Sequence, residues 1–209
     1  MLDLAWRRLY LCVPGRDDMA EFLPAVLRGG VDVVQLREKE APDSERVRVA
    51  TVMVRICRDF NVPFIMNDSP ELAMEVGADG VHVGQDDVSV EHCRQVLGSQ
   101  AIVGLSTHSA FELDAALTTT ATYLSAGPIV ETPTKPGRRA TGIDYPVAAQ
   151  ALSGRPVFVT GGVSEANVAT FVAAGLRHFV VVRAITDAPD PGAAARSIRA
   201  AIEEALTHR

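Results

Sequence analysis

Two aspartates follow neighbouring apolar segments of this chain, and their type and spacing suit a divalent cation. Asp68 comes directly after the run PFIMN, and Asp87 follows the next run, GVHVG. Two carboxylates, completed by phosphate oxygens and water, make the kind of site that Mg²⁺ prefers. The alternative is that Asp68 begins the turn Asn-Asp-Ser-Pro and that Asp86 and Asp87 cap the following helix. Their shared place after adjacent apolar runs favours the metal site.

Basic side chains elsewhere in the chain could balance the charge of a phosphate. Arg37 and Lys39 alternate along an extended segment, so both can point in the same direction. Lys135 lies in a later loop that also holds Arg138 and Arg139. The chain carries 20 Lys and Arg against 26 Asp and Glu, a net charge of −6, so phosphate chemistry needs such a local cluster. The alternative for the first pair is a solvated, ion-paired loop.

Composition limits the partners and the compartment. The negative net charge argues against a nucleic-acid or membrane-surface partner, because no global positive field attracts a phosphate polymer. The 3 cysteines are far apart, which argues against a disulfide framework and a structural zinc site. No apolar run approaches the roughly 20 residues of a membrane span, and the first residues lack a signal-peptide pattern. We expect a cytoplasmic protein with small-molecule substrates; assembly into a homo-oligomer is left open.

The segments that must position these groups alternate between short apolar runs and longer amphipathic stretches, a pattern typical of parallel strands joined by crossover helices. The runs predict strands at residues 9–13, 31–37, 63–67, 80–84, 102–107, 123–129, 156–161 and 178–185. Eight strand–helix units in 209 residues, with no Pro/Gly/Ser-rich linker, predict a single (β/α)8 TIM barrel over residues 1–209. The alternative is an open doubly wound sheet, but PGRDD follows the first strand where that fold usually has a glycine-rich turn.

A barrel of this kind places its active site at the carboxyl ends of the strands, so the polar residues after each apolar run should meet there. The pair Gly161-Gly162 follows the seventh run and exposes backbone N–H groups before a helix. This arrangement suits a phosphate, and a simple turn would use it too. His82 lies inside its strand pattern, where it either contacts a substrate or packs in the barrel interior.

These segments resemble, in order and across essentially the whole chain, the thiamine-phosphate synthase family. The matching motifs are LYL near the start, QLREK (35–39), ND (67–68), GVHVGQDD (80–87), GLSTHS (104–109), TPTKPG (132–137) and GGV (161–163). The resemblance implies a barrel-fold transferase of thiamine biosynthesis. Such an enzyme joins hydroxymethylpyrimidine diphosphate to a thiazole phosphate, carboxylated or not, and releases pyrophosphate. It also implies one Mg²⁺ per subunit.

The resemblance implies roles for individual residues as well. The pyrimidine diphosphate is expected to contact Gln35, Leu36, Arg37, Glu38, Lys39, Asn67, His82, Ser106 and Lys135. The thiazole phosphate is expected to contact Thr132, Pro133, Thr134, Gly162, Val182 and Arg183. Asp68 and Asp87 are the expected Mg²⁺ ligands. Arg37, Lys39 and Lys135 are expected to act catalytically by taking up the charge that grows on the departing pyrophosphate, in a dissociative displacement without a nucleophilic side chain.

Two other functions fit part of this pattern. A related thiazole tautomerase has a similar barrel but needs neither a diphosphate substrate nor a metal pair. The retention of QLREK, both aspartates and TPTK argues against that isomerase. A non-catalytic binder of thiamine phosphates would keep the site and show no turnover.

Overall fold

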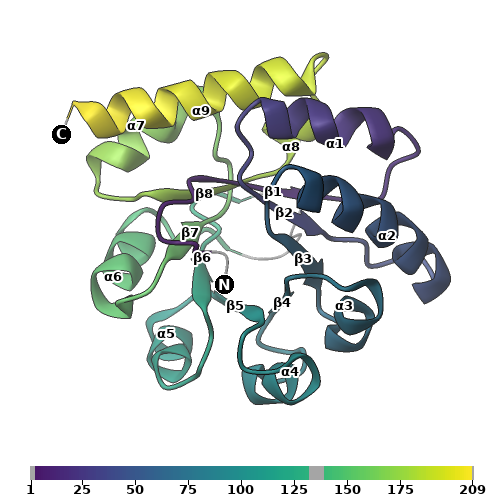
Figure 1. Ribbon diagram of the computed structural model, residues 1–209. Helices are drawn as coiled ribbons and strands as arrows, with labels where there is room; N and C mark the ends of the chain where they lie inside the picture. The colour runs from purple at the N-terminus through teal and green to yellow at the C-terminus, as the bar shows by residue number, and fades with distance from the viewer. Residues whose placement is uncertain (1–2, 132–138, 209) are drawn as a thin grey trace.

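The fold is a closed barrel of parallel strands surrounded by helices (Figure 1). The computed structural model describes residues 3–131 and 139–208. The strands follow one another around the barrel in sequence order, from β1 to β8, and β8 pairs with β1 to close it. The predicted (β/α)8 barrel is therefore confirmed, and the open doubly wound sheet is excluded.

The elements alternate along the chain as the apolar pattern predicts. The strands are β1 (Leu9–Val13), β2 (Val33–Leu36), β3 (Phe64–Asn67), β4 (Gly80–Val83), β5 (Ile102–Thr107), β6 (Tyr123–Ala126), β7 (Val157–Val159) and β8 (His178–Val181). The helices are α1 (Met19–Arg28), α2 (Asp43–Asp59), α3 (Pro70–Val76), α4 (Val90–Leu97), α5 (Ala110–Leu117), α6 (Asp144–Ser153), α7 (Glu165–Ala173), α8 (Arg183–Thr186) and α9 (Pro191–Thr207). Within the described residues, none of these helices has both the length and the apolar character needed to cross a membrane.

The predicted eighth strand is wrong in its second half. β8 ends at Val181, and the short helix α8 begins two residues later. The backbone N–H of Thr186 bonds back to the carbonyl oxygen of Val182, which is the helical pattern. A short apolar run has no periodicity that separates a buried strand from a buried helical turn, so the sequence could not mark this change.

The core has two layers because each strand is buried on both faces. Side chains that point outward pack beneath the helices, and side chains that point inward fill the barrel. The inner cluster consists of Leu4, Tyr10, Val33, Ile65, Ile102, Tyr123 and Phe158, with Val180 packed against it. The rings of Tyr10, Tyr123 and Phe158 contact one another with centroids 5.2–5.9 Å apart. The middle of the barrel is thus a packed aromatic layer.

Buried charged and polar groups gather at the amino-terminal end of the barrel. Asp32, just before β2, accepts a hydrogen bond of 2.9 Å from the backbone N–H of Leu9. Nη1 of Arg199, on α9, lies 2.5 Å from Oδ2 of Asp32. At the start of β8, Nδ1 of His178 donates to the carbonyl oxygen of Arg7 at 2.6 Å. These contacts tie β1, β2, β8 and α9 together at the end of the barrel opposite to the strand carboxyl ends.

Candidate active site

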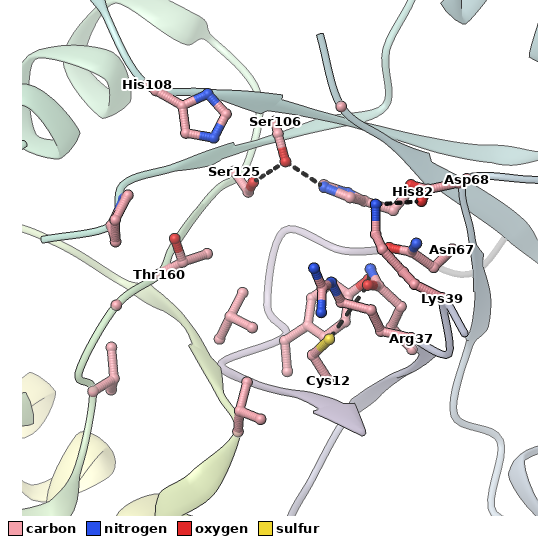
Figure 2. A pocket seen from close by; sticks show the side chains of 18 of the residues that line it. Cys12, Arg37, Lys39, Asn67, Asp68, His82, Ser106, His108, Ser125 and Thr160 are labelled. Atoms are coloured by element: carbon pink, nitrogen blue, oxygen red, sulfur yellow. Dashed lines mark hydrogen bonds and ion pairs between the residues drawn. The ribbon is translucent and has the colours of Figure 1, made fainter. Parts of the chain in front are cut away.

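A pocket of about 580 Å³ opens at the carboxyl ends of the strands, where the barrel geometry predicts an active site (Figure 2). This volume is in the range of roughly 300–1,000 Å³ that is typical of small-molecule sites. Eleven of the residues proposed from the sequence line it together: Gln35, Arg37, Lys39, Asn67, Asp68, His82, Asp87, Ser106, Gly162, Val182 and Arg183. Residues at or after the carboxyl ends of β2, β3, β4, β5, β7 and β8 therefore meet in one pocket, as the position of active sites in barrels predicts.

Two proposed contacts of the pyrimidine diphosphate do not line this pocket. Leu36 packs in the outer core, and the Glu38 carboxylate accepts a hydrogen bond of 3.2 Å from the backbone N–H of Gly15. Both line a separate cavity outside the barrel mouth. Successive residues of an extended segment point to opposite sides. Leu36 and Glu38 therefore point away from the pocket that Gln35, Arg37 and Lys39 line. The remaining proposed residues lie outside the described residues: Thr132, Pro133, Thr134 and Lys135.

Asp68 and Lys39 form an ion pair at the pocket wall. Nζ of Lys39 lies 2.8 Å from Oδ2 of Asp68, as the dashed line in Figure 2 marks. Asp68 has a φ of 63°, an uncommon conformation that Asp adopts more readily than most residues. Its backbone N–H donates to the carbonyl oxygen of His82 at 2.8 Å, which holds the loop after β3 against β4. Burial raises the pKa of the Asp68 carboxyl group, Lys39 opposes this effect, and Asp87 adds to it.

Asp87 is held by the loop after β4 and does not cap a helix. Its Oδ2 accepts a hydrogen bond of 2.7 Å from the backbone N–H of Gly84. The cap of α4 is Ser89, whose hydroxyl oxygen accepts from the backbone N–H of His92 at 3.1 Å. The structure therefore excludes the helix-cap alternative for Asp87, because another residue has that role.

The two aspartates fit a hard divalent cation. Both line the same pocket, at the ends of the neighbouring strands β3 and β4, and Asp87 is one of the causes that raise the pKa of the Asp68 carboxyl group. Carboxylate oxygens are the donors that Mg²⁺ prefers. Within residues 3–131 and 139–208, no three His, Cys, Asp or Glu side chains gather into a metal site. Two carboxylates would leave coordination positions of such a cation open to phosphate oxygens and water.

A loop with two successive glycines lines the pocket after β7. Gly161 and Gly162 have φ values of 95° and 73°, which glycine adopts without strain. A Cβ at Gly161 would overlap Pro128, and a Cβ at Gly162 would overlap Val130. Nδ2 of Asn167 donates to the carbonyl oxygen of Gly162 at 2.7 Å, which ties the loop to the first turn of α7. A glycine loop that precedes a helix in this way is a recurrent phosphate site of barrels.

Arg183 supplies a cation on the same side as this loop. It is the first residue of α8, it is exposed, and it lines the pocket together with Val182. The pocket thus has cations after the two strands that flank β1, with Arg37 and Lys39 after β2 and Arg183 after β8. Such a distribution suits two separate phosphate groups.

Polar residues that the sequence reasoning missed form the floor of the pocket: Tyr10, Cys12, Tyr123 and Ser125. They occupy the inward positions of β1 (LYLCV) and β6 (YLSA). Because inward side chains recur at every second residue of a strand, this alternation is the signal that could have identified them. The alternation was not recognised because tyrosine and cysteine are counted with the apolar residues when strands are predicted from apolar runs.

The floor residues join His82 and Gln35 in a line of hydrogen bonds. Nε2 of Gln35 donates to the Tyr10 hydroxyl oxygen at 2.8 Å, and the hydroxyl oxygens of Tyr10 and Tyr123 are 2.8 Å apart. Nδ1 of His82 lies 3.0 Å from the Tyr123 hydroxyl oxygen, and Nε2 lies 2.9 Å from Oγ of Ser106. The packing interpretation of His82 is confirmed, because the ring is buried in the barrel interior. The ring also lines the pocket, and its contact with a substrate stays a prediction.

Together, the closed barrel and the pocket at its strand carboxyl ends, lined by carboxylates, cations and a glycine loop, define an enzyme site for small molecules. Comparison with known proteins narrows this class. Residues 9–185 match the family model described as thiamine monophosphate synthase. The chain belongs to this family.

Individual relatives agree with the family assignment. The chain is 44% identical over 208 residues to the thiamine-phosphate synthase of Acidothermus cellulolyticus, with 97% of this chain and 98% of the relative covered. It is 43% identical over 198 residues to the thiamine-phosphate synthase of Thermus thermophilus, with 92% and 95% covered. The solved structure of a thiamine phosphate pyrophosphorylase from Pyrococcus furiosus has a TM-score of 0.87 and 27% identity, with 96% and 97% covered.

Proposed function

We propose that this chain is a thiamine-phosphate synthase. It transfers the pyrimidinylmethyl group of hydroxymethylpyrimidine diphosphate to the nitrogen of a thiazole phosphate and releases pyrophosphate. If the thiazole is carboxylated, its carboxyl group leaves as CO₂ as well. The observation that carries this proposal is the convergence of Lys39, Asp68 and Asp87 at one side of a pocket whose other side holds the Gly161-Gly162 loop. The named relatives, matched over nearly their full length, support the same reaction.

The diphosphate belongs at the side of the pocket formed after β2, β3 and β4. Asp68 and Asp87 would hold one Mg²⁺ per chain, and the ion would supply positive charge to the leaving pyrophosphate. Lys39 contacts Asp68 in this structure. Occupation of the aspartate pair by a cation would release the Lys39 ammonium group to a phosphate oxygen, beside Arg37.

The pyrimidine belongs deeper in the pocket, against the polar floor. Asn67 is buried, and among the described residues its Nδ2 atom has no hydrogen-bond partner. A buried unsatisfied donor is costly, and an acceptor on the substrate would remove that cost. Ser106 and His82 lie on neighbouring strands in the same region and offer further hydrogen bonds.

The chemistry needs charge stabilisation and no covalent intermediate with the protein. The C–O bond to the pyrophosphate breaks first, with its electron pair leaving on oxygen, and the aminopyrimidine stabilises the methylene cation. The thiazole nitrogen then attacks that carbon. Arg37 and Lys39 are placed to stabilise the growing negative charge, which is often the largest catalytic contribution. The second phosphate, on the thiazole, fits the Gly161-Gly162 loop and Arg183.

The test is an assay of the purified chain with both substrates and Mg²⁺, with each component omitted in turn. We expect pyrophosphate and thiamine phosphate in equal amounts only in the complete mixture, and loss of both products with EDTA. Folded protein that forms no product under these conditions would overturn the proposal. Isomerisation of a thiazole substrate without diphosphate would instead identify a tautomerase. Tight binding of thiamine phosphate with zero turnover would identify a non-catalytic binder.

A further inference from the structure

A glycine on β5 allows side chains from the two neighbouring strands to meet. The strand register pairs Gly104 with His82 on β4 and with Tyr123 on β6. A Cβ at Gly104 would overlap both the Tyr123 phenol and Nδ1 of His82. Because β5 contributes no side chain at this level, the two rings stack with centroids 5.5 Å apart. The contact between His82 and Tyr123 therefore depends on three strands in register.

The hydrogen bonds along the pocket floor start at Gln35, whose amide nitrogen is a donor only. The Cys12 thiol donates to Oε1 of Gln35 at 3.4 Å, and Nε2 of Gln35 donates to the Tyr10 hydroxyl oxygen at 2.8 Å. The Tyr10 and Tyr123 hydroxyl oxygens are 2.8 Å apart, and either group can donate in this contact; donation by Tyr10 is the direction that gives its proton an acceptor while its oxygen accepts from Gln35. In that direction Tyr123 accepts from Tyr10, and its single proton is then directed to Nδ1 of His82, 3.0 Å away.

This direction determines what Ser106 can offer to a ligand. When Nδ1 of His82 accepts, the imidazole proton lies on Nε2, which donates to Oγ of Ser106 at 2.9 Å. The Ser106 hydroxyl group then has its own proton left to donate. Oγ of Ser125, 3.2 Å away, is an acceptor for it when no substrate is bound. Burial raises the pKa of both Tyr10 and Tyr123, so both phenols keep the protons that this direction requires.

We propose that Tyr10 and Tyr123 are positioning residues that hold His82 as the Nε2–H tautomer, so that Ser106 presents a proton to an acceptor on the bound substrate. The acceptor would be a ring nitrogen or a phosphate oxygen. In the reverse direction, Ser106 would donate to His82 and would offer only lone pairs to the substrate. The role assigned to Ser106 rests on the proposed function, whereas the tautomer of His82 is a property of the chain alone.

The tautomer can be measured without substrate. Long-range ¹H–¹⁵N spectra of protein labelled at histidine distinguish a protonated from an unprotonated ring nitrogen, and the His82→Gln variant assigns the signals. We expect the wild-type chain to show His82 protonated on Nε2. We expect Tyr123→Phe to shift the population toward the Nδ1–H form. Tyr145→Phe is the matched control, because Tyr145 lies on α6 and does not line the pocket.

Kinetics then separate positioning from a purely structural role. We expect Tyr123→Phe to lower kcat/KM for the pyrimidine diphosphate about tenfold, the size of one net hydrogen bond, and to leave KM for the thiazole phosphate unchanged. Tyr145→Phe should change neither value. Circular dichroism confirms folding, and Tyr10→Phe replaces Tyr123→Phe if the latter does not fold.

Two results would overturn the inference: a wild-type His82 protonated on Nδ1, or an unchanged tautomer in a folded Tyr123→Phe variant. A wild-type chain with the expected tautomer but no turnover would instead overturn the proposed function. The two failures are therefore distinguishable.

Discussion

The ammonium group of Lys39 lies 2.8 Å from the carboxylate of Asp68, and both side chains keep contact with water, at 46% and 26% exposure. An ion pair this exposed contributes at most about 1 kcal/mol to stability. The pair is therefore exchangeable, and a cation at Asp68 or a phosphate at Lys39 can replace either partner. This exchange is what the proposed diphosphate site requires.

Replacing Lys39 should damage turnover far more than stability. We expect Lys39→Gln to lower kcat about 100-fold, because a positioned positive charge next to the leaving group is lost. The free energy of unfolding should change by less than about 1 kcal/mol. Arg48→Gln is the control, because it removes the same charge from an ion pair with Glu45 on the surface of α2. Steady-state kinetics and urea unfolding measure both effects, and equal losses of turnover in the two variants would contradict the assigned role.

Replacing Asp87 should weaken the metal requirement of the reaction without disturbing its loop. In Asp87→Asn the side-chain oxygen can still accept from the backbone N–H of Gly84, so the loop should keep its shape. We expect turnover to fall about 100-fold, because the charge that holds the ion is lost. The Mg²⁺ concentration for half-maximal rate should rise. Asp114→Asn, an exposed change on α5, controls for net charge. Unchanged Mg²⁺ dependence would remove Asp87 from the metal site.

An alanine at Gly104 should strain the barrel interior. Its Cβ would overlap Tyr123 and His82, and overpacking of this kind costs about 1–3 kcal/mol of the free energy of unfolding. Gly15→Ala is the control, since its Cβ would meet Glu38 at an ordinary 3.5 Å. That change should alter stability by less than about 1 kcal/mol. Denaturant unfolding compares the variants, and a Gly104→Ala chain as stable as the wild type would contradict the packing seen here.

The stability of the fold should fall as the solution becomes acidic, through His178. Burial, with a smaller contribution from the charges of Arg8 and Arg177, lowers the pKa of this imidazole from an ordinary value of 6.5 to about 4, against the opposing effect of the hydrogen bond to the Arg7 carbonyl oxygen. Between these pH values the unfolded chain binds a proton that the folded chain does not, so stability falls as pH drops through this window. At about 1.4 kcal/mol per pKa unit, the free energy of unfolding should lose about 3 kcal/mol by pH 4.

A variant isolates this contribution. In His178→Gln, the free energy of unfolding should depend less steeply on pH between 6.5 and 4. His208→Gln, which changes an exposed histidine near the end of the chain, should keep the wild-type slope. Urea unfolding at a series of pH values measures both. The same slope in wild type and His178→Gln would show that other groups cause the acid sensitivity.

The barrel was predictable because its strands are buried on both faces and therefore read as separate apolar runs. The same property hides the end of β8, since residues 182–185 continue the apolar run into a helix. Side chains alternate along an extended segment, and this alternation predicted that Arg37 and Lys39 point the same way. Asp68 and Asp87 were expected in the pocket because each follows a predicted strand. The pairing of Lys39 with Asp68 depends on a loop with positive φ, which no local pattern indicates.

The pocket floor was less predictable, for a different reason. Tyr10 and Tyr123 lie within apolar runs, so their hydroxyl groups do not interrupt the hydrophobic pattern. Their contact with His82 depends on the register of β4, β5 and β6 and on the missing side chain of Gly104. Register between strands far apart in sequence is a tertiary property, which a single sequence does not display.

His178, which makes the fold sensitive to acid, and the pocket lie at opposite ends of the same short strands. Asp32, Arg199 and His178 lie at the amino-terminal end, and the pocket lies at the carboxyl end. Substitutions that make the protein tolerant of low pH can therefore be chosen without contact with the substrates. Conversely, the pocket can be redesigned for another phosphorylated heterocycle while the charged groups at the far end continue to hold the barrel closed.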